Sequence, residues 1–181
     1  MFQQLKLTFA LILFMSFCLE SHAASDICKT CECKNNETRI DCSSRGLTSA
    51  PQPIPPNVVD LDLSYNDLHT IEAETFPNLF SLQTLDFRGN KIEEVNEEAF
   101  RNLSSLESLD FQDNKIMQLK AGTFQNLSKL TDLDLRENKI MQLKAGTFLN
   151  LSKLTDLYLQ YNDITEIEVG CFQNLPSLKT L

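Results

Sequence analysis

Residues 58–68 read VVDLDLSYNDL, and the pattern of this stretch decides the fold. An aliphatic residue at position 58 is followed by Leu61, Leu63, Asn66 and Leu68. The same frame begins again, each time after 24 residues, at Leu82, Leu106, Leu130, Leu154 and Leu178. A fixed period of this length indicates one supersecondary unit stacked on copies of itself. We therefore expect a solenoid of five repeats over residues 58–177, followed by the start of a truncated sixth over residues 178–181.

Each repeat is expected to contribute one short strand, because leucines alternate with polar residues at the start of the frame. The expected strands cover residues 60–63, 84–87, 108–111, 132–135 and 156–159. Stacking would make them parallel neighbours about 4.8 Å apart. The rest of each repeat must return on the opposite side of the coil. Gly122, Gly146 and Gly170 interrupt the return segments, so short 3₁₀ or extended pieces are expected there.

Two further columns belong to the interior of the solenoid. The first is an apolar set in the return segments that contains one phenylalanine in each repeat: Phe76, Phe100, Phe124, Phe148 and Phe172. The second is an asparagine at each strand exit: Asn66, Asn90, Asn114, Asn138 and Asn162. A side-chain amide both donates and accepts hydrogen bonds, so it can satisfy backbone groups where the chain turns inward. We expect a buried asparagine ladder with a structural role.

The first residues have the pattern of a secretory signal peptide. Lys6 precedes an apolar run from Leu7 to Leu19, and the small residues around Ala23 suit a cleavage site. A membrane anchor is the alternative, but the run is too short to span a bilayer comfortably. The signal peptide is predicted over residues 1–23, and no second long apolar run follows it.

Four cysteines lie close together in residues 24–57: Cys28, Cys31, Cys33 and Cys42. In an exported protein such a cluster is most simply two disulfides. A zinc site is the weaker alternative, because the spacing lacks paired C-x2-C knuckles. Pairing Cys31 with Cys33 would close a strained loop, which leaves two connectivities. A shift of 21 residues aligns Ile40 and Cys42 with Leu61 and Leu63, so this segment is predicted to be a degenerate repeat that caps the solenoid.

The repeat frame, the x4-F-x2-L return and the C-x2-C-x-C-x8-C spacing together resemble extracellular leucine-rich-repeat proteins of the 24-residue subclass. Toll-like receptors, slit-type guidance proteins and variable lymphocyte receptors belong to this group. The resemblance implies a right-handed α/β solenoid, mostly β and irregular and shaped like a horseshoe, with a parallel sheet on its concave face and a disulfide-bonded N-terminal cap. It also implies the pairs Cys28–Cys33 and Cys31–Cys42.

The concave face would expose the variable positions between the leucines. The candidate partner-binding residues there are Asp62, Tyr65, Asp86, Arg88, Asp110, Asp134, Arg136, Tyr158 and Tyr161. Such a face suits a basic protein or peptide, with the tyrosines as anchors. The alternative is that the aspartates belong to the scaffold, because aspartate is frequent at this position in the superfamily that the chain resembles.

Two more features bear on the surface. Glycosylation sequons lie at Asn36, Asn102, Asn126 and Asn150, and the last three share one column. Cys171 falls in a column otherwise filled by small residues. It is expected to be a small buried residue, with an intermolecular disulfide as the alternative.

Nothing in the chain indicates catalysis, a cofactor or a metal site. His69 is the only histidine after the signal peptide, and no triad pattern or glycine-rich phosphate loop accompanies it. The formal net charge of −9 disfavours nucleic acid and anionic membranes as partners. We therefore predict a secreted, non-enzymatic glycoprotein that binds a protein partner, with immune or adhesion roles implied by the resemblance. The alternatives are a structural matrix component and a fragment of a receptor ectodomain.

Overall fold

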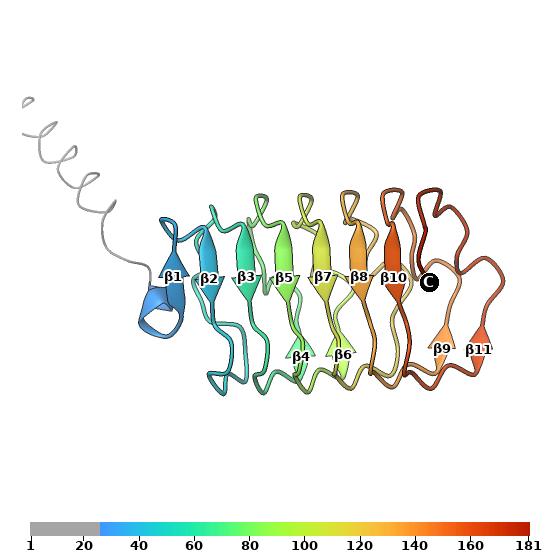
Figure 1. Cartoon of the computed structure of the whole chain (residues 1–181), viewed down its shortest axis with the longest axis horizontal. Coiled ribbons are helices and arrows are strands. Elements are labelled where there is room, and N and C mark those ends of the chain that lie inside the picture. Colours follow the sequence, from blue (N-terminus) through green and yellow to red (C-terminus); the bar gives the residue numbers. More distant parts are fainter. Residues whose placement is uncertain (1–25) are drawn as a thin grey trace, which may run out of the picture.

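The computed structural model describes residues 26–181, and the predicted signal peptide lies outside them. The described chain is a β-solenoid whose coils stack along one axis (Figure 1). Its main sheet contains seven strands in the order β1-β2-β3-β5-β7-β8-β10. Their bounds are Glu32–Lys34 (β1), Arg39–Asp41 (β2), Asp60–Asp62 (β3), Thr84–Asp86 (β5), Ser108–Asp110 (β7), Asp132–Asp134 (β8) and Asp156–Tyr158 (β10).

The strands from β2 to β10 are parallel, and from β3 onward each pairs with the residues 24 positions further along the chain. The 24-residue period predicts this register. Each repeat strand is one residue shorter than expected. The fourth residue, Leu63 in the first repeat, still donates its N–H to the Asp86 carbonyl over 2.8 Å. It lies where the chain begins to turn away from the sheet, which ends the regular strand.

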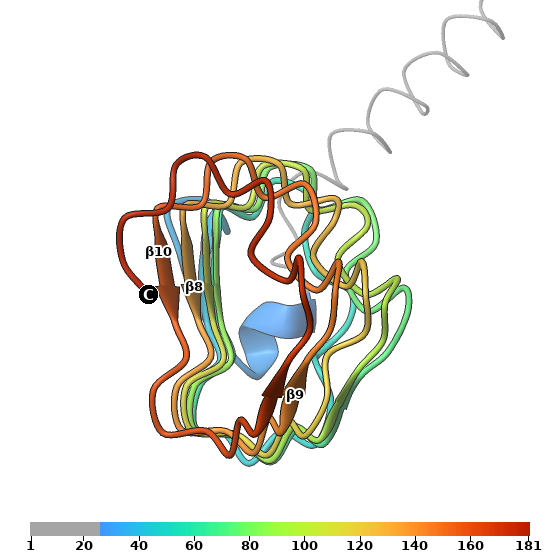
Figure 2. The ribbon, with the colours of Figure 1, turned by 90° about the vertical axis from the view of Figure 1, so that its right-hand side faces the viewer.

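The return side of the coil contains only short strands. β4 (Thr70–Ile71) pairs with β6 (Glu94–Val95), and β9 (Gln142–Leu143) pairs with β11 (Glu166–Ile167). Figure 2 looks along the coil and shows β8 and β10 on one wall and β9 on another. Within residues 26–181 the only helix is a 3₁₀ turn, η1 (Asp26–Lys29). The solenoid is therefore almost entirely β and irregular.

One continuous apolar core fills the coil, and the leucine positions of the frame are almost completely buried. Four phenylalanines of the return side stack in succession, with ring centroids 6.2 Å apart for Phe100 and Phe124, 6.4 Å apart for Phe124 and Phe148, and 5.8 Å apart for Phe148 and Phe172. Offset stacking of this kind adds to the burial of the rings. Phe87 and Phe111 occupy a leucine position of the frame and form a second stacked pair at 5.0 Å.

The N-terminal end is closed by the cysteine-rich segment. Ile27 of η1 is buried against the core, and Figure 2 shows this helix, in blue, across the end of the coil. β1 and β2 form an antiparallel hairpin, and β2 pairs in parallel with β3 so that Ile40 lies opposite Leu61. That is the predicted 21-residue shift. Disulfides join Cys28 to Cys33 and Cys31 to Cys42, the pairing that the resemblance implies.

Candidate functional site

The candidate site is the sheet face, which we define as the solvent side of the seven-stranded sheet together with the residues just after each strand. One aspartate from each of five neighbouring strands lies in a single row across this face. The strand register aligns Asp41, Asp62, Asp86, Asp110 and Asp134. Tyr158 takes the next place in the row, on β10.

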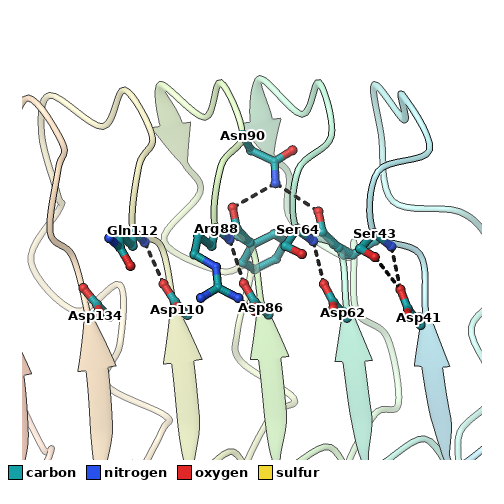
Figure 3. Close-up of polar contacts among 12 residues, drawn as sticks. Asp41, Ser43, Asp62, Ser64, Asp86, Arg88, Asn90, Asp110, Gln112 and Asp134 are labelled. Atoms are coloured by element: carbon teal, nitrogen blue, oxygen red, sulfur yellow. Dashed lines mark hydrogen bonds and ion pairs between the residues drawn. The ribbon is translucent and has the colours of Figure 1, made fainter.

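Each aspartate of the row closes the turn at the end of its own strand. Its Oδ1 atom accepts a hydrogen bond from the backbone N–H two residues further on, as Figure 3 shows for four of the five. The distance is 2.8 Å from Arg88 to Asp86 and 2.9 Å from Arg136 to Asp134. Short polar side chains commonly close turns in this way. These contacts favour the scaffold interpretation of the aspartates, although their second oxygens are not used by the turn.

Two of the aspartates each form an ion pair with an arginine, and each of these arginines also lies over a tyrosine ring. The Arg88 Nη2 atom lies 3.1 Å from Asp86 Oδ2, and its guanidinium carbon lies 5.7 Å from the centre of the Tyr65 ring. Arg136 binds Asp134 through Nε, 2.8 Å from Oδ2, and its guanidinium carbon lies 5.1 Å from the Tyr158 ring. Cation–π contacts of this length are favourable. Four of the predicted tyrosines and arginines are thus held in two preformed groups.

Within the described part of the chain, no arginine forms an ion pair with Asp110. Its neighbours in the row, Asp86 and Asp134, carry the same charge, and Gln112 stands where the adjacent repeats have arginine. Burial, followed by these two like charges, raises the pKa of Asp110 to about 6, against the opposing effect of the Gln112 N–H. Burial and neighbouring carboxylates also raise the pKa of Asp132. The centre of the face therefore holds more negative charge than its arginines compensate.

A hollow of about 420 Å³ lies at the end of the face nearest the cysteine-rich segment. It is lined by the carboxylates Asp41, Asp60, Asp62 and Asp86, among other residues. Arg39 is paired with Asp60 at 2.9 Å, and the remaining cation of the lining, Lys34, is paired with Glu32. The sequence-based prediction did not include Asp41, Asp60 or this hollow. Asp41 could have been predicted, because the 21-residue shift that aligns the cap with the first repeat also aligns Asp41 with Asp62.

The asparagine column lies directly behind the face and holds adjacent coils together. The Asn90 Nδ2 atom donates to the carbonyls of Leu63 and Phe87, 3.0 and 2.8 Å away, as drawn in Figure 3. Its Oδ1 atom accepts from the N–H of Leu68 in the preceding repeat. Asn114, Asn138 and Asn162 repeat this geometry. Each amide thus spans two repeats, which gives the column a structural role.

The other predicted residues lie away from the sheet face, except Tyr161, which belongs to its far end. Cys171 is buried in the column of small residues. The sequon asparagines Asn36, Asn126 and Asn150 are exposed, whereas Asn102 is half-buried. Tyr161 follows β10 and is 80 % exposed. Over residues 26–181 no group of His, Cys, Asp and Glu side chains is arranged to hold a metal ion.

Comparison with known proteins agrees with this geometry. A family model for the BspA type leucine rich repeat region matches residues 65–181 in six copies, which is more than half of the chain. The chain belongs to the leucine-rich-repeat family. As a member, it is a protein-interaction module. Within residues 26–181, no helix has the length and apolar character that crossing a membrane requires.

Several curated relatives share part of the chain. Leucine-rich repeat-containing protein 4 of Rattus norvegicus is 40 % identical over 55 residues, which is 30 % of this chain and 8 % of the relative. Leucine-rich repeat-containing protein 3 of Danio rerio is 42 % identical over 60 residues, 32 % of this chain and 23 % of the relative. Oligodendrocyte-myelin glycoprotein of Mus musculus is 36 % identical over 56 residues, 31 % of this chain and 12 % of the relative. The matched segments span less than a quarter of each of these relatives.

Proposed function

We propose that this leucine-rich-repeat chain is an extracellular binding module whose sheet face recognises a basic protein partner. The two disulfides suit an oxidising compartment, where such bonds form and persist. An immune or adhesion role, which the resemblance implies, remains a prediction, as do the matrix and receptor alternatives. The name of one relative, Leucine-rich repeat and transmembrane domain-containing protein 1 of Mus musculus, mentions a transmembrane domain, and that description applies to the relative.

The observation that supports a basic partner most directly is the hollow at the cap end of the face. Its carboxylates outnumber its cations, and both lining cations are already engaged in ion pairs. The side chain of Asp86 is only 20 % exposed, so it interacts with charge through a medium less polar than water. A lysine or arginine side chain of a partner that enters the hollow would meet Asp62 there, and it would share Asp86 with Arg88. Charge complementarity of this kind governs specificity and the rate of association.

Exposed tyrosines supply the second element of the proposal. Tyr65 remains 55 % exposed although Arg88 covers part of its ring, and Tyr161 is exposed at the other end of the face. Tyrosine contributes apolar contact area and a hydroxyl group with little loss of side-chain entropy. We expect the partner to lie across the strands, with its cationic residues over the aspartate row and apolar contacts at the tyrosines.

The test begins with the identification of a partner, by capture of cell-surface and secreted proteins on the mature chain. Its affinity is then measured for the wild type and for the double variant Asp62→Asn, Asp86→Asn. Asparagine keeps an oxygen that can accept the turn hydrogen bond, so the substitution removes charge and leaves the strand exits closed. We expect at least a tenfold loss of affinity, which corresponds to about 1.4 kcal/mol.

The matched control is the variant Glu93→Gln, Glu97→Gln. It changes the net charge by the same amount at exposed positions outside the sheet face. This control should bind like the wild type. If both variants lost affinity equally, the loss would be due to the change in net charge and not to the sheet face. Hydrogen-exchange protection confined to the return side of the coil would exclude the sheet face as the binding surface.

A further inference from the structure

The lysines of the chain are concentrated on the third and fourth repeats, away from the sheet face. Residues 114–131 and 138–155 contain three lysines each and no aspartate or glutamate. The lysines are Lys115, Lys120, Lys129, Lys139, Lys144 and Lys153. The corresponding segments of the first, second and fifth repeats all contain acidic residues. An acidic protein therefore carries one basic band that is two repeats wide.

Backbone contacts hold the two lysine-rich segments in register. Lys139 N–H donates to the Ile116 carbonyl over 3.0 Å, and Gly122 N–H donates to the Gly146 carbonyl over 3.1 Å. Between these contacts, Gln118 and Gln142 form a parallel bridge. Lys115 therefore lies beside Lys139, and Lys120 lies beside Lys144. We call these four residues the lysine patch.

The lysine patch is not neutralised by the protein itself. Lys29, Lys34 and Lys91 each form an ion pair with a nearby carboxylate, whereas among the described residues, 26–181, no ion pair involves a member of the patch. Lys120 and Lys139 are exposed, and Lys115 and Lys144 are half-buried. Two methionines between the lysine columns, Met117 and Met141, are 47 % and 52 % exposed. The patch thus offers cations and apolar contact area on one strip of surface.

Acidic residues border the strip on both sides. Next to Lys120 lies a hollow of about 330 Å³ whose lining also includes Glu93 and Glu94 of the second repeat. On the opposite side, Glu168 of the fifth repeat accepts the Ala145 N–H over 2.9 Å. Because these carboxylates lie next to the lysines, a flat anionic surface such as a membrane would meet both signs of charge. A linear polyanion can follow the strip and avoid the acidic repeats.

We propose that the lysine patch binds a sulfated polysaccharide. Adjacent coils place neighbouring lysines roughly 5 Å apart, and Lys115 and Lys120 are separated by at most about 17 Å along the chain. A sulfated chain presents a repeating row of anionic groups that such paired cations match. The Debye length is about 8 Å at physiological ionic strength. A chain bound along the strip therefore interacts more strongly with the lysines beneath it than with acidic residues more than a Debye length away.

The test uses the mature chain, with heparin as the probe. Two variants are compared with the wild type at 150 mM salt. In one, Lys115, Lys120, Lys139 and Lys144 become glutamine; in the control, Lys29, Lys34, Lys91 and Lys179 become glutamine. Both lose four positive charges. We expect the patch variant to lose at least tenfold in affinity for heparin, and the control to stay within twofold of the wild type.

Three results would overturn the proposal. These are failure of the wild type to bind heparin, an equal loss in both variants, and binding of anionic phospholipid vesicles or single-stranded DNA as tightly as heparin. Circular dichroism of each variant establishes that it is folded. The partner affinity of the Asp62→Asn, Asp86→Asn variant is measured separately, so failure of the polysaccharide proposal leaves the sheet-face proposal untouched.

Discussion

Asp110 illustrates how a single residue on the sheet face depends on its neighbours in space. From β5 and the residues after it, Asp86 and Arg88 act on its charge, and from β8 and its exit, Asp134 and Arg136 do so. Gln112 supplies only a backbone hydrogen bond to it. Asp110 is partly buried and forms no ion pair with an arginine of the described chain. Its burial therefore raises its pKa to about 6. The charged form of this residue is therefore less stable in the folded protein than in the unfolded chain.

We expect Asp110 to destabilise the fold at neutral pH and to stop doing so in mild acid. The pKa of Asp110 is higher in the folded protein than its unfolded value of 3.8, so the folded state binds this proton more tightly than the unfolded state. The contribution of Asp110 to the free energy of unfolding therefore becomes more favourable as the pH falls from 7 to 4. Asp110→Asn should be more stable than the wild type at pH 7.5, and the difference should shrink at pH 5. Urea unfolding at both values measures it.

Asp67 provides the control for this experiment. Its pKa is lowered by the hydrogen bond and charge of Lys91, so its contribution to stability is present above the unfolded pKa and is lost only in stronger acid. The charge of His69 also lowers this pKa, so the control is made in a His69→Gln background. There the effect of Asp67→Asn should not change between pH 7.5 and pH 5. A constant difference for Asp110→Asn as well would contradict the assignment.

The turn at each strand exit is the element that repeats most closely. The third residue after each repeat strand has a positive φ: Tyr65, Gly89, Asp113, Glu137 and Tyr161. Four of these five residues carry a side chain, so the conformation alone does not require glycine. Gly89 is special because the Tyr65 ring lies against it. A Cβ atom on Gly89 would stand 2.5 Å from the Tyr65 Cδ1 atom.

We expect Gly89→Ala to destabilise the protein by displacing the Tyr65 ring. The comparison is Gly46→Ala, because Gly46 has a similar φ of +66° and a Cβ there would meet nothing within 4 Å. Both variants carry the cost of a left-handed alanine, and overpacking should add about 1 kcal/mol or more at Gly89. Chemical denaturation measures both losses. In a Tyr65→Ala background the added loss should vanish, and its persistence there would refute the explanation.

At the scale of the whole molecule, the solenoid is a set of near-copies, each supported by its neighbours. Asn114–Leu133 and Asn138–Leu157 differ only at Gln125 and Leu149. The contacts at each boundary are of the same kind: a parallel strand pair and an asparagine that spans two coils. In such arrays stability is approximately a sum of repeat and interface contributions.

Deletion of residues 115–138 should therefore give a shorter protein that still folds. Asn114 would join Lys139, which restores the frame, and the unfolding m-value should fall by roughly a sixth because less surface is exposed. Circular dichroism and urea unfolding test this outcome. Deletion of residues 115–134, which removes 20 residues and breaks the period, should abolish cooperative unfolding. If both deletions behave alike, the repeats are not interchangeable units.

Prediction from the sequence succeeded where a feature recurs with the period. Leu61 and Asn66 repeat every 24 residues, and the strand register and the asparagine ladder follow from that spacing. The sheet face was predicted less completely. The pairing of Arg88 with Tyr65 and the hollow beside Asp60 depend on which side chains face one another across adjacent coils. Periodicity places residues in columns but does not specify those contacts.

The sequence by itself determined the stacked coil, its parallel sheet and its apolar interior, because leucines at a fixed spacing can be buried together only when successive repeats lie in register. Only the tertiary structure decided how the aspartate row divides. Asp86 and Asp134 are neutralised by arginines, while Asp110 is left between two like charges. The physical reason is that charge interactions depend on distance and burial, which arise only when residues 24 positions apart come into contact across the sheet.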